Sequence, residues 1–186
     1  EISAGIPLSS NFPTEDHLSD EKTEPIAWSE MFTVSAGQRG TFQLKAGLKI
    51  YELAMQAERM PGKFRESTKI TIIPRYCVAN LLTKENIYLR QKGVERSTVE
   101  ILTNGFSSFH WEDSHFERLV EFKTESSAWS NGSIDISRVG STALLLPRSG
   151  QSEARVLNID VKVAQDLRVD EYAVLVTIWT ASNKRS

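Results

Sequence analysis

The fold is decided by the stretch VLNIDVKV at residues 156–163. Apolar and polar side chains alternate along this stretch, and the apolar ones include Leu157, Ile159, Val161 and Val163. Successive side chains of a β-strand point to opposite faces of a sheet. The alternation therefore predicts a strand with one buried face and one solvated face.

Strand patterns of this kind recur from Trp28 to the C-terminal part of the chain. Four further stretches show them, at residues 69–72, 86–90, 133–136 and 174–178. Turn-forming dipeptides separate the stretches: Pro61-Gly62, Asn104-Gly105, Asn131-Gly132 and Ser149-Gly150. Short strands with regular turns, and almost no helical periodicity, predict an all-β fold of antiparallel strands in sandwiches or barrels.

One segment fits two structures. Residues 50–60, IYELAMQAERM, are rich in helix-forming residues and contain neither glycine nor proline. The apolar positions Tyr51, Leu53 and Met55 also have the spacing of a strand. Because strands flank the segment and sheet context often overrides propensity, we predict a strand here, with a helix as the alternative.

The chain of 186 residues has an ordinary globular composition, with 40% hydrophobic and 25% charged residues. Lys and Arg number 22 against 24 Asp and Glu, so the net charge is -2. This balance gives no compositional support to nucleic-acid binding, and we predict no nucleic-acid partner. The single cysteine, Cys77, excludes an intramolecular disulfide and a cysteine-rich zinc site.

The sequence contains an internal repeat. Trp28-Ser29 recurs as Trp129-Ser130, and a glycine follows each pair at Gly40 and Gly140. The spacing corresponds to a unit of about 100 residues, as expected for an array of similar modules. We therefore predict tandem β-sandwich modules of that size.

The predicted organisation has three parts. Residues 28–74 are the C-terminal half of one module, and residues 75–186 are a nearly complete second module. Residues 1–27 hold three of the six prolines together with several acidic residues, so we predict an extended acidic arm or linker.

Several short motifs, taken in order, resemble one family. Trp28-Ser29-Glu30-Met31-Phe32 followed by Gly40 resembles its "WS-x-x-F…G" strand. Residues 73–80, IPRYCVAN, resemble the next strand, which ends in a recurrent asparagine. Phe109-His110-Trp111 resembles the "PF-x-W" element, in a form typical of fungal members. Across residues 28–180 the chain resembles the adaptor-binding domain of the vacuolar protein sorting 13 family, the bridge-like lipid transfer proteins.

This resemblance implies a row of β-sandwich modules that binds organelle adaptor proteins through short Pro-x-Pro motifs. The parent protein would be cytoplasmic and peripheral at organelle membrane contact sites, with a membrane association that is indirect, through the adaptors. The recurrent asparagine, which is Asn80 here, is implied to maintain the module and its adaptor binding. The second copy departs from the pattern, because Gly132-Ser133 stands where the first has Met31-Phe32.

We predict partner contacts near the strand at residues 69–80, which leaves one module and enters the next. An extended peptide that contains proline can add to the exposed edge of such a sandwich. The candidate residues are Tyr76, Asn80, Tyr88, Arg90 and Trp111. Asn80 can instead tie neighbouring backbone segments together, and the repeated aromatic residues can instead pack in the core. Trp111 follows a turn-like stretch, so we expect it to be the most exposed of these aromatic residues.

The sequence does not favour an enzyme. It contains no G-x-S-x-G, dinucleotide-binding or P-loop motif. One cluster has metal-ligating residue types, and its members are His110, Glu112, Asp113 and His115. Their spacing matches no standard zinc site, so we predict no catalytic residues, no metal and no cofactor.

Two alternatives to adaptor binding stay open. The modules can be structural spacers whose adaptor site lies on other repeats. A surface for acidic membrane lipids can instead form from the basic residues Arg75, Arg90, Lys92 and Arg96. Glutamates are interspersed among these residues, which favours a solvated surface of mixed charge.

Overall fold

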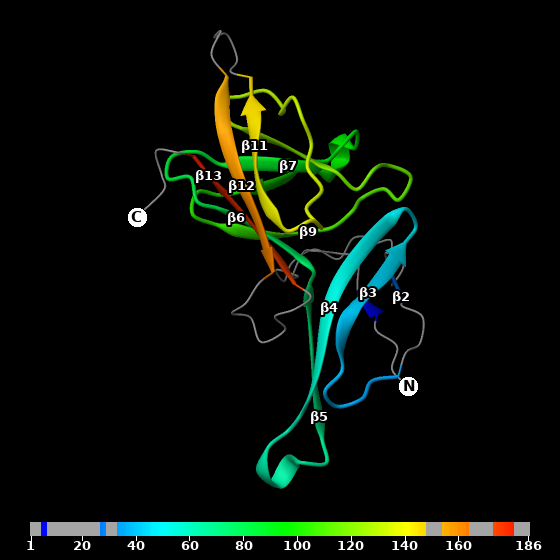
Figure 1. Cartoon of the computed structure of the whole chain (residues 1–186). Helices are drawn as coiled ribbons and strands as arrows, with labels where there is room; N and C mark the ends of the chain where they lie inside the picture. Colours follow the sequence, from blue (N-terminus) through cyan, green and yellow to red (C-terminus); the bar gives the residue numbers. More distant parts are fainter. Residues whose placement is uncertain (1–4, 7–26, 29–32, 148–153, 164–172, 181–186) are drawn as a thin grey trace, which may run out of the picture.

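The computed structural model describes residues 5–6, 27–28, 33–147, 154–163 and 173–180 (Figure 1). The strands are β1 (Gly5–Ile6), β2 (Ala27–Trp28), β3 (Arg39–Ala46), β4 (Lys49–Arg59), β5 (Thr68–Pro74), β6 (Tyr76–Asn80), β7 (Ile87–Gln91), β8 (Val99–Ile101), β9 (Phe106–Phe109), β10 (Val120–Thr124), β11 (Gly140–Leu146), β12 (Arg155–Val163) and β13 (Val174–Trp179). Two short 3-10 helices complete the list, η1 (Gly62–Phe64) and η2 (Glu95–Ser97). The all-β prediction is confirmed. Within the described ranges, no helix is long and apolar enough to cross a lipid bilayer.

A β-sandwich forms the larger part of the molecule. One sheet has five strands in the order β11-β12-β13-β6-β9, and the other has three in the order β10-β7-β8. Neighbouring strands are antiparallel, as predicted, except for the parallel pair β13 and β6. This pair begins at one end of the sandwich, where the Val174 N–H donates a 2.6 Å hydrogen bond to the Arg75 carbonyl.

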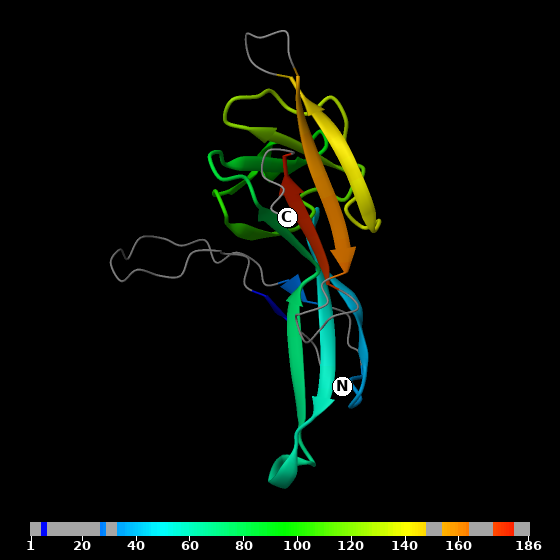
Figure 2. The same ribbon diagram turned by 60° about the vertical axis from the view of Figure 1, so that its left-hand side comes forward.

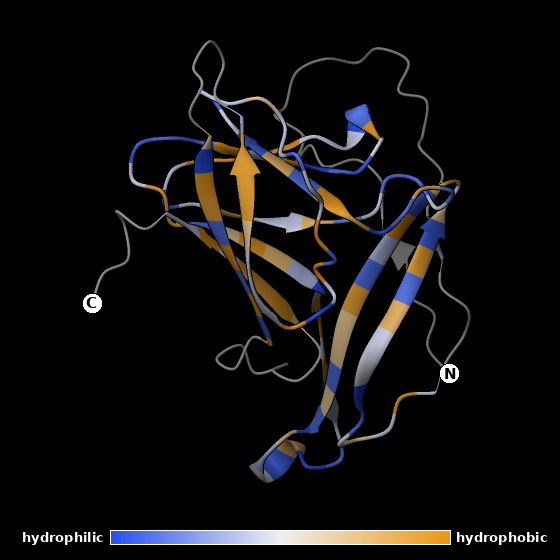
Figure 3. Ribbon diagram, turned by 45° about the horizontal axis from the view of Figure 1, so that its top comes forward, coloured by the Kyte–Doolittle hydropathy of each residue, from blue (hydrophilic) through white to orange (hydrophobic). Residues whose placement is uncertain are grey.

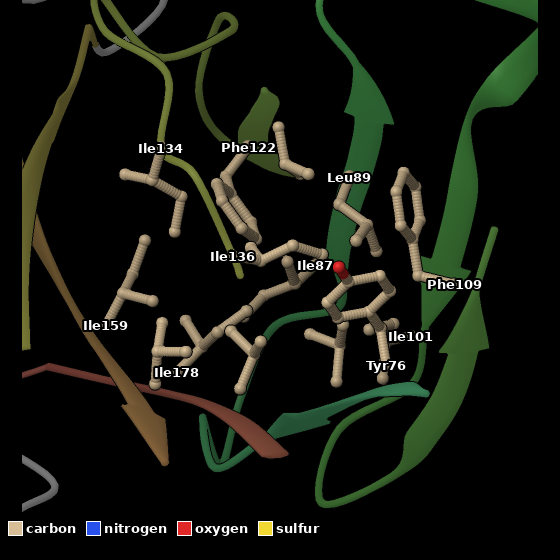
Figure 4. Packing of buried hydrophobic residues seen from close by; sticks show 14 of the residues in the cluster. Tyr76, Ile87, Leu89, Ile101, Phe109, Phe122, Ile134, Ile136, Ile159 and Ile178 are labelled. Carbon is tan, nitrogen blue, oxygen red and sulfur yellow. The ribbon is translucent and has the colours of Figure 1, made fainter. Parts of the chain in front are cut away.

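The core lies between the two sheets (Figure 4). Alternate residues of each strand are buried there as the sequence pattern predicts, including Ile87 and Leu89 of β7 and Leu157 and Ile159 of β12. Full burial of one such side chain stabilises a fold by about 1.5–3 kcal/mol. This alternation is therefore the main local determinant of the sandwich.

Two stretches with strand patterns behave differently from the rest. Residues 133–136 bury Ile134 and Ile136, but the backbone makes only an isolated bridge between Ile134 and Val120. Residues 69–72 lie in β5 as predicted, yet no residue of β5 is fully buried. The reason is that β5 is the edge strand of a three-stranded sheet, so it has a neighbouring strand on one side only.

The ambiguous segment is a strand, which confirms the prediction. It forms β4, the central strand of the antiparallel sheet β3-β4-β5. Residues 50–57 are all buried, so β4 has no solvated face over this length. Figure 2 shows this sheet extending away from the sandwich.

The start of β4 is joined to the sandwich. Ile50 and Trp111 form an antiparallel bridge with backbone hydrogen bonds of 2.7 and 3.1 Å. The predicted modules at residues 28–74 and 75–186 stay a prediction. The arm predicted at residues 1–27 lies outside the described residues, apart from β1 and part of β2, which pair with each other.

Candidate functional site

Asn80 ends β6, and its side chain is fully buried with four hydrogen bonds. Its Nδ2 donates to three backbone carbonyls, those of Glu85, Ile101 and Leu102, at 3.0, 3.1 and 3.2 Å. Its Oδ1 accepts a 2.9 Å bond from the N–H of Leu82. Both ends of the amide are therefore satisfied by backbone groups. This arrangement favours the role of tying segments together over direct contact with a partner.

Trp111 is a core residue, and the expectation that it is exposed was wrong. Its side chain is 1% exposed. The ring packs edge-on against Tyr76 and Phe109, at centroid distances of 5.8 and 5.1 Å. The bridge to Ile50 places Trp111 beside the start of β4. The turn-like residues before Trp111 carry no sign of this long-range pairing, which is why the local pattern misled.

Tyr88 and Arg90 lie on the outer face of β7 and are partly exposed. The Tyr88 hydroxyl donates a 2.8 Å hydrogen bond to Glu100 on β8. Arg90 Nε donates a 3.1 Å bond to Glu121 on β10, and its guanidinium lies 4.0 Å from the ring centroid of Trp129. This face thus has paired charges around a half-buried aromatic ring.

The other basic residues considered for acidic lipids are paired in the same way. Arg75 lies 3.5 Å from Glu52, Lys92 lies 2.8 Å from Glu117, and Arg96 lies 3.1 Å from Asp113. Each positive charge has a carboxylate beside it. These residues therefore do not make an uncompensated basic surface.

The structure separates the five candidate residues into two groups. Tyr76, Asn80 and Trp111 are buried, whereas Tyr88 and Arg90 face outward from the opposite sheet. No single surface holds all five. Their contact with a partner stays a prediction.

Exposed apolar side chains surround the backbone that Asn80 holds. Leu81, Leu102 and Phe106 are 45%, 63% and 79% exposed. Asn80 Nδ2 bonds the Leu102 carbonyl, and the Asn80 N–H donates a 2.9 Å bond to the carbonyl of Gly105. We call Leu81, Leu102 and Phe106 the Asn80 patch. This patch was not predicted, although the apolar residues on both sides of the Asn104-Gly105 turn were a signal.

The Asn80 patch adjoins a sheet edge. β9 is the last strand of the five-stranded sheet and pairs only with β6 among the described strands. Asn80 and Gly105 are hydrogen-bonded across this pair, so the alternation of an antiparallel ladder turns the backbone groups of Phe106 and Ser108 away from β6. The edge thus presents N–H and C=O groups beside an exposed phenylalanine ring.

A buried carboxylate lies where the sheet β3-β4-β5 meets the sandwich. Glu52 on β4 is 4% exposed and accepts hydrogen bonds from Tyr76 at 2.8 Å and from Gln43 at 3.1 Å. Its Oε1 also pairs with Arg118, and Arg75 lies beside its Oε2. Sequence reasoning missed Glu52 and Arg118, because their contact joins residues that are 66 positions apart.

This carboxylate affects the titration of its neighbour. Burial raises the pKa of Tyr76 well above its ordinary value, and the nearby Glu52 carboxylate raises it further. The hydroxyl therefore stays protonated and keeps donating to Glu52. This hydrogen bond links β4 and β6.

Among the residues with metal-ligating side chains near Trp111, Asp113 and His115 lie 3.4 Å apart, whereas His110 and Glu112 have other partners. His110 packs against the Tyr51 ring at a centroid distance of 4.7 Å, and burial followed by the Lys49 charge lowers the His110 pKa to about 4. Glu112 pairs with Lys49 at 2.6 Å. In the part of the chain that the structure describes, no group of three or more His, Cys, Asp or Glu is placed to hold a metal ion.

Comparison with known proteins identifies one family. No curated protein matches the chain. The family model of the vacuolar-sorting associated protein 13 adaptor binding domain matches residues 18–168, which is more than half of the 186 residues. The chain therefore belongs to the family of the vacuolar-sorting associated protein 13 adaptor binding domain.

Proposed function

We propose that this chain captures short Pro-x-Pro motifs of organelle adaptor proteins, and thereby recruits a lipid transfer protein to membrane contact sites. The match to the adaptor-binding family over residues 18–168 is the observation that carries the proposal. The chain would then act as a binding module rather than an enzyme. The parent protein would be cytoplasmic and peripheral to the membrane.

The chemistry of a Pro-x-Pro motif suits the edge of a sheet. Proline has no backbone N–H, so it cannot donate to a ladder. In an extended strand the backbone groups of the two prolines face one side of the peptide. The N–H and C=O of the residue between them face the other side. Such a peptide can pair on one side only. It can therefore add to an edge without extending the sheet further.

The β9 edge offers the matching groups. Phe106 and Ser108 turn their backbone N–H and C=O outward, and the Asn80 patch lies beside them. The middle residue of the motif would pair with this edge while the proline rings contact apolar side chains such as Phe106 and Leu102. Asn80 would act as a positioning residue, since its bonds fix the Leu102 carbonyl and the turn that follows.

The test is a titration of a labelled Pro-x-Pro peptide into the whole chain. We expect saturable binding that is lost when both prolines of the peptide are replaced by alanine. Phe106→Ala should weaken binding about tenfold, the usual effect of removing an aromatic anchor. Leu145→Ala is the matched control, because Leu145 is 51% exposed on β11 at the opposite edge of the same sheet.

Two results would contradict this assignment. No saturable binding to the folded chain would favour the structural spacer, with recognition on other repeats. Equal weakening by Phe106→Ala and Leu145→Ala would show that the peptide does not bind at the β9 edge. Adaptor binding elsewhere on the chain would still hold.

A further inference from the structure

The β4–β5 hairpin ends in a segment that adaptor binding does not use. Residues 58–69 contain four basic residues, Arg59, Lys63, Arg65 and Lys69, and two acidic ones, Glu58 and Glu66. The segment therefore has a net charge of +2 in a chain whose net charge is -2, which leaves -4 on the other residues. We call residues 58–69 the hairpin tip.

The hairpin tip projects from the molecule. It lies at the end of the sheet that is farthest from the sandwich, and Figure 3 shows it as mainly hydrophilic (Figures 1 and 3). Residues 61–69 are all exposed. Among the described residues, no ion pair holds Arg59, Lys63 or Lys69. The tip's positive charges are thus presented to solvent.

The ion pair within the hairpin tip is weak. Arg65 lies 3.4 Å from Glu66, but these side chains are 81% and 90% exposed. Water and salt screen a pair of this kind, so it does little to neutralise the arginine. Lys69 lies opposite Glu58 in the β4–β5 register without an ion pair between them.

An aromatic side chain stands among these charges. Phe64 is 54% exposed on η1, and the Lys63 ammonium lies 5.1 Å from the centre of its ring. The hairpin tip therefore presents an apolar ring and a positive charge on the same projecting turn. The lysine beside the ring and the arginine after it are also exposed.

The turn that carries Phe64 has a defined, hydrogen-bonded conformation. Gly62 has a φ of 63°, a conformation that favours glycine. The Met60 N–H donates to the Ser67 carbonyl at 3.0 Å, and the Ser67 N–H donates to the Phe64 carbonyl at 2.8 Å. These bonds close the tip and hold the phenylalanine outside the strands. Little ordering would therefore be needed on binding.

We propose that the hairpin tip binds an anionic phospholipid bilayer. Phe64 enters the interface between headgroups and acyl chains, where aromatic rings are favoured, and Lys63 and Arg65 contact lipid phosphates. An apolar ring beside basic residues combines the two attractions that act on an interfacial segment, burial of apolar area and electrostatic attraction to anionic lipids. The hairpin tip projects from the molecule, so it can approach the broad surface of a membrane (Figures 1 and 2).

This contact goes beyond adaptor capture, because it needs no adaptor. The β9 edge would select the organelle, and the hairpin tip would add a direct, weaker attachment to its membrane. Two linked contacts raise the overall affinity by effective concentration. The tip residues also differ from the paired basic residues that the sequence suggested for acidic lipids.

The test is flotation of the whole chain with lipid vesicles. The vesicles contain phosphatidylcholine with or without about 30% phosphatidylserine, a content that gives the negative surface which attracts basic segments. We expect binding to the anionic vesicles that falls as salt rises. The double variant Lys63→Glu and Arg65→Glu should weaken binding at least about tenfold, and Phe64→Ala should weaken it about fivefold or more, as loss of interfacial apolar area predicts.

A matched control separates the tip from overall charge. Lys45→Glu with Lys84→Glu makes the same charge change at two exposed lysines outside the tip and should leave vesicle binding nearly unchanged. Equal loss in both double variants, or no binding of the unmodified chain at low salt, would overturn the proposal. Binding of a polyglutamate peptide without binding of vesicles would assign the tip to an acidic protein partner instead. The assay contains no adaptor, so its failure is distinct from failure of the peptide titration.

Discussion

The Tyr76 hydroxyl donates a 2.8 Å hydrogen bond to the buried carboxylate of Glu52. Tyr76 starts β6 of the sandwich, and Glu52 lies in the central strand of the sheet β3-β4-β5. The bond therefore joins the two parts of the fold. The Arg75 N–H strengthens the same junction with a 2.9 Å bond to the Glu52 carbonyl.

Removing the charge of Glu52 should weaken this junction. Glu52→Gln keeps the size of the side chain but leaves Arg75 and Arg118 without their anionic partner. Breaking a buried ion pair costs about 3–5 kcal/mol, and the partial exposure of both arginines lowers our expectation to about 2–3 kcal/mol. Urea unfolding followed by circular dichroism measures the change in the free energy of unfolding.

An exposed pair provides the control for this variant. Glu117→Gln removes the partner of Lys92 in a pair whose side chains are 67% and 46% exposed. Its effect should stay below about 1 kcal/mol. If the two variants destabilise the chain equally, burial does not make the Glu52 ion pairs contribute more to stability than an exposed pair.

Alkaline pH should test the Tyr76 bond. The pKa of Tyr76 is raised in the folded state by burial and by Glu52. A raised pKa contributes stability that is fully present below the unfolded value of about 10 and is lost as pH rises toward the folded value. Tyr76→Phe should therefore lose less stability than the unmodified chain above pH 10, in unfolding measured across that range. Parallel curves for the two proteins would contradict this cause.

Acidic pH should expose the buried imidazole. The pKa of His110 is lowered to about 4, first by burial and then by Lys49. The unfolded chain binds a proton near pH 6.5 and the folded chain does not, so stability is lost as pH falls from about 6.5 to 4. The loss should be about 3 kcal/mol, at 1.36 kcal/mol for each unit of pKa difference. Unfolding measured over this range should show a flatter profile for His110→Leu.

A core variant serves as the reference for that experiment. Val176 lies in β13 with 0% exposure, and it is not titratable. Val176→Ala should lower the free energy of unfolding by a similar amount at every pH, because it removes packing alone. An unchanged acid slope in His110→Leu would show that another group causes the loss.

Local pattern predicts the strands because the alternation of apolar and polar residues is a local property of the sequence. The alternation in β7 and β12, and the choice of strand for β4, follow from neighbouring residues in the sequence. Trp111 and Glu52 could not be placed in this way. Trp111 is buried by its bridge to Ile50, and Glu52 pairs with Arg118, which is 66 residues away. Such contacts depend on how the sheets meet.

The candidate site was predictable to the same extent. An asparagine can bond nearby backbone groups, so the tying role of Asn80 was open to sequence reasoning, and its bond to the Leu82 N–H is local. Its bonds to Ile101 and Leu102 cross 21 and 22 residues and were not predictable. The Asn80 patch depends on those distant bonds. The motif therefore located the asparagine but not the surface that it holds.

The hydrogen bonds of Asn80 lead to a prediction about stability and binding together. Asn80→Asp removes the Nδ2 donor and places a carboxylate oxygen against three backbone carbonyls. Each buried group left unpaired costs about 1–3 kcal/mol, so we expect the free energy of unfolding to fall by at least about 2 kcal/mol. The free energy of unfolding of Asn80→Ala should fall by a similar amount. Thermal unfolding monitored by circular dichroism measures both variants.

The binding consequence separates positioning from contact. Below its unfolding temperature, Asn80→Ala should bind the Pro-x-Pro peptide more weakly, and amide exchange at Leu82 should rise in the same variant, because the Leu82 N–H donates to Asn80 Oδ1. Asn86→Ala is the control: it breaks bonds to Glu100 and Thr103 at the surface and leaves Asn80 in place. Weaker peptide binding with no rise in exchange would show that the Asn80 side chain acts on the partner directly, against the buried geometry seen here.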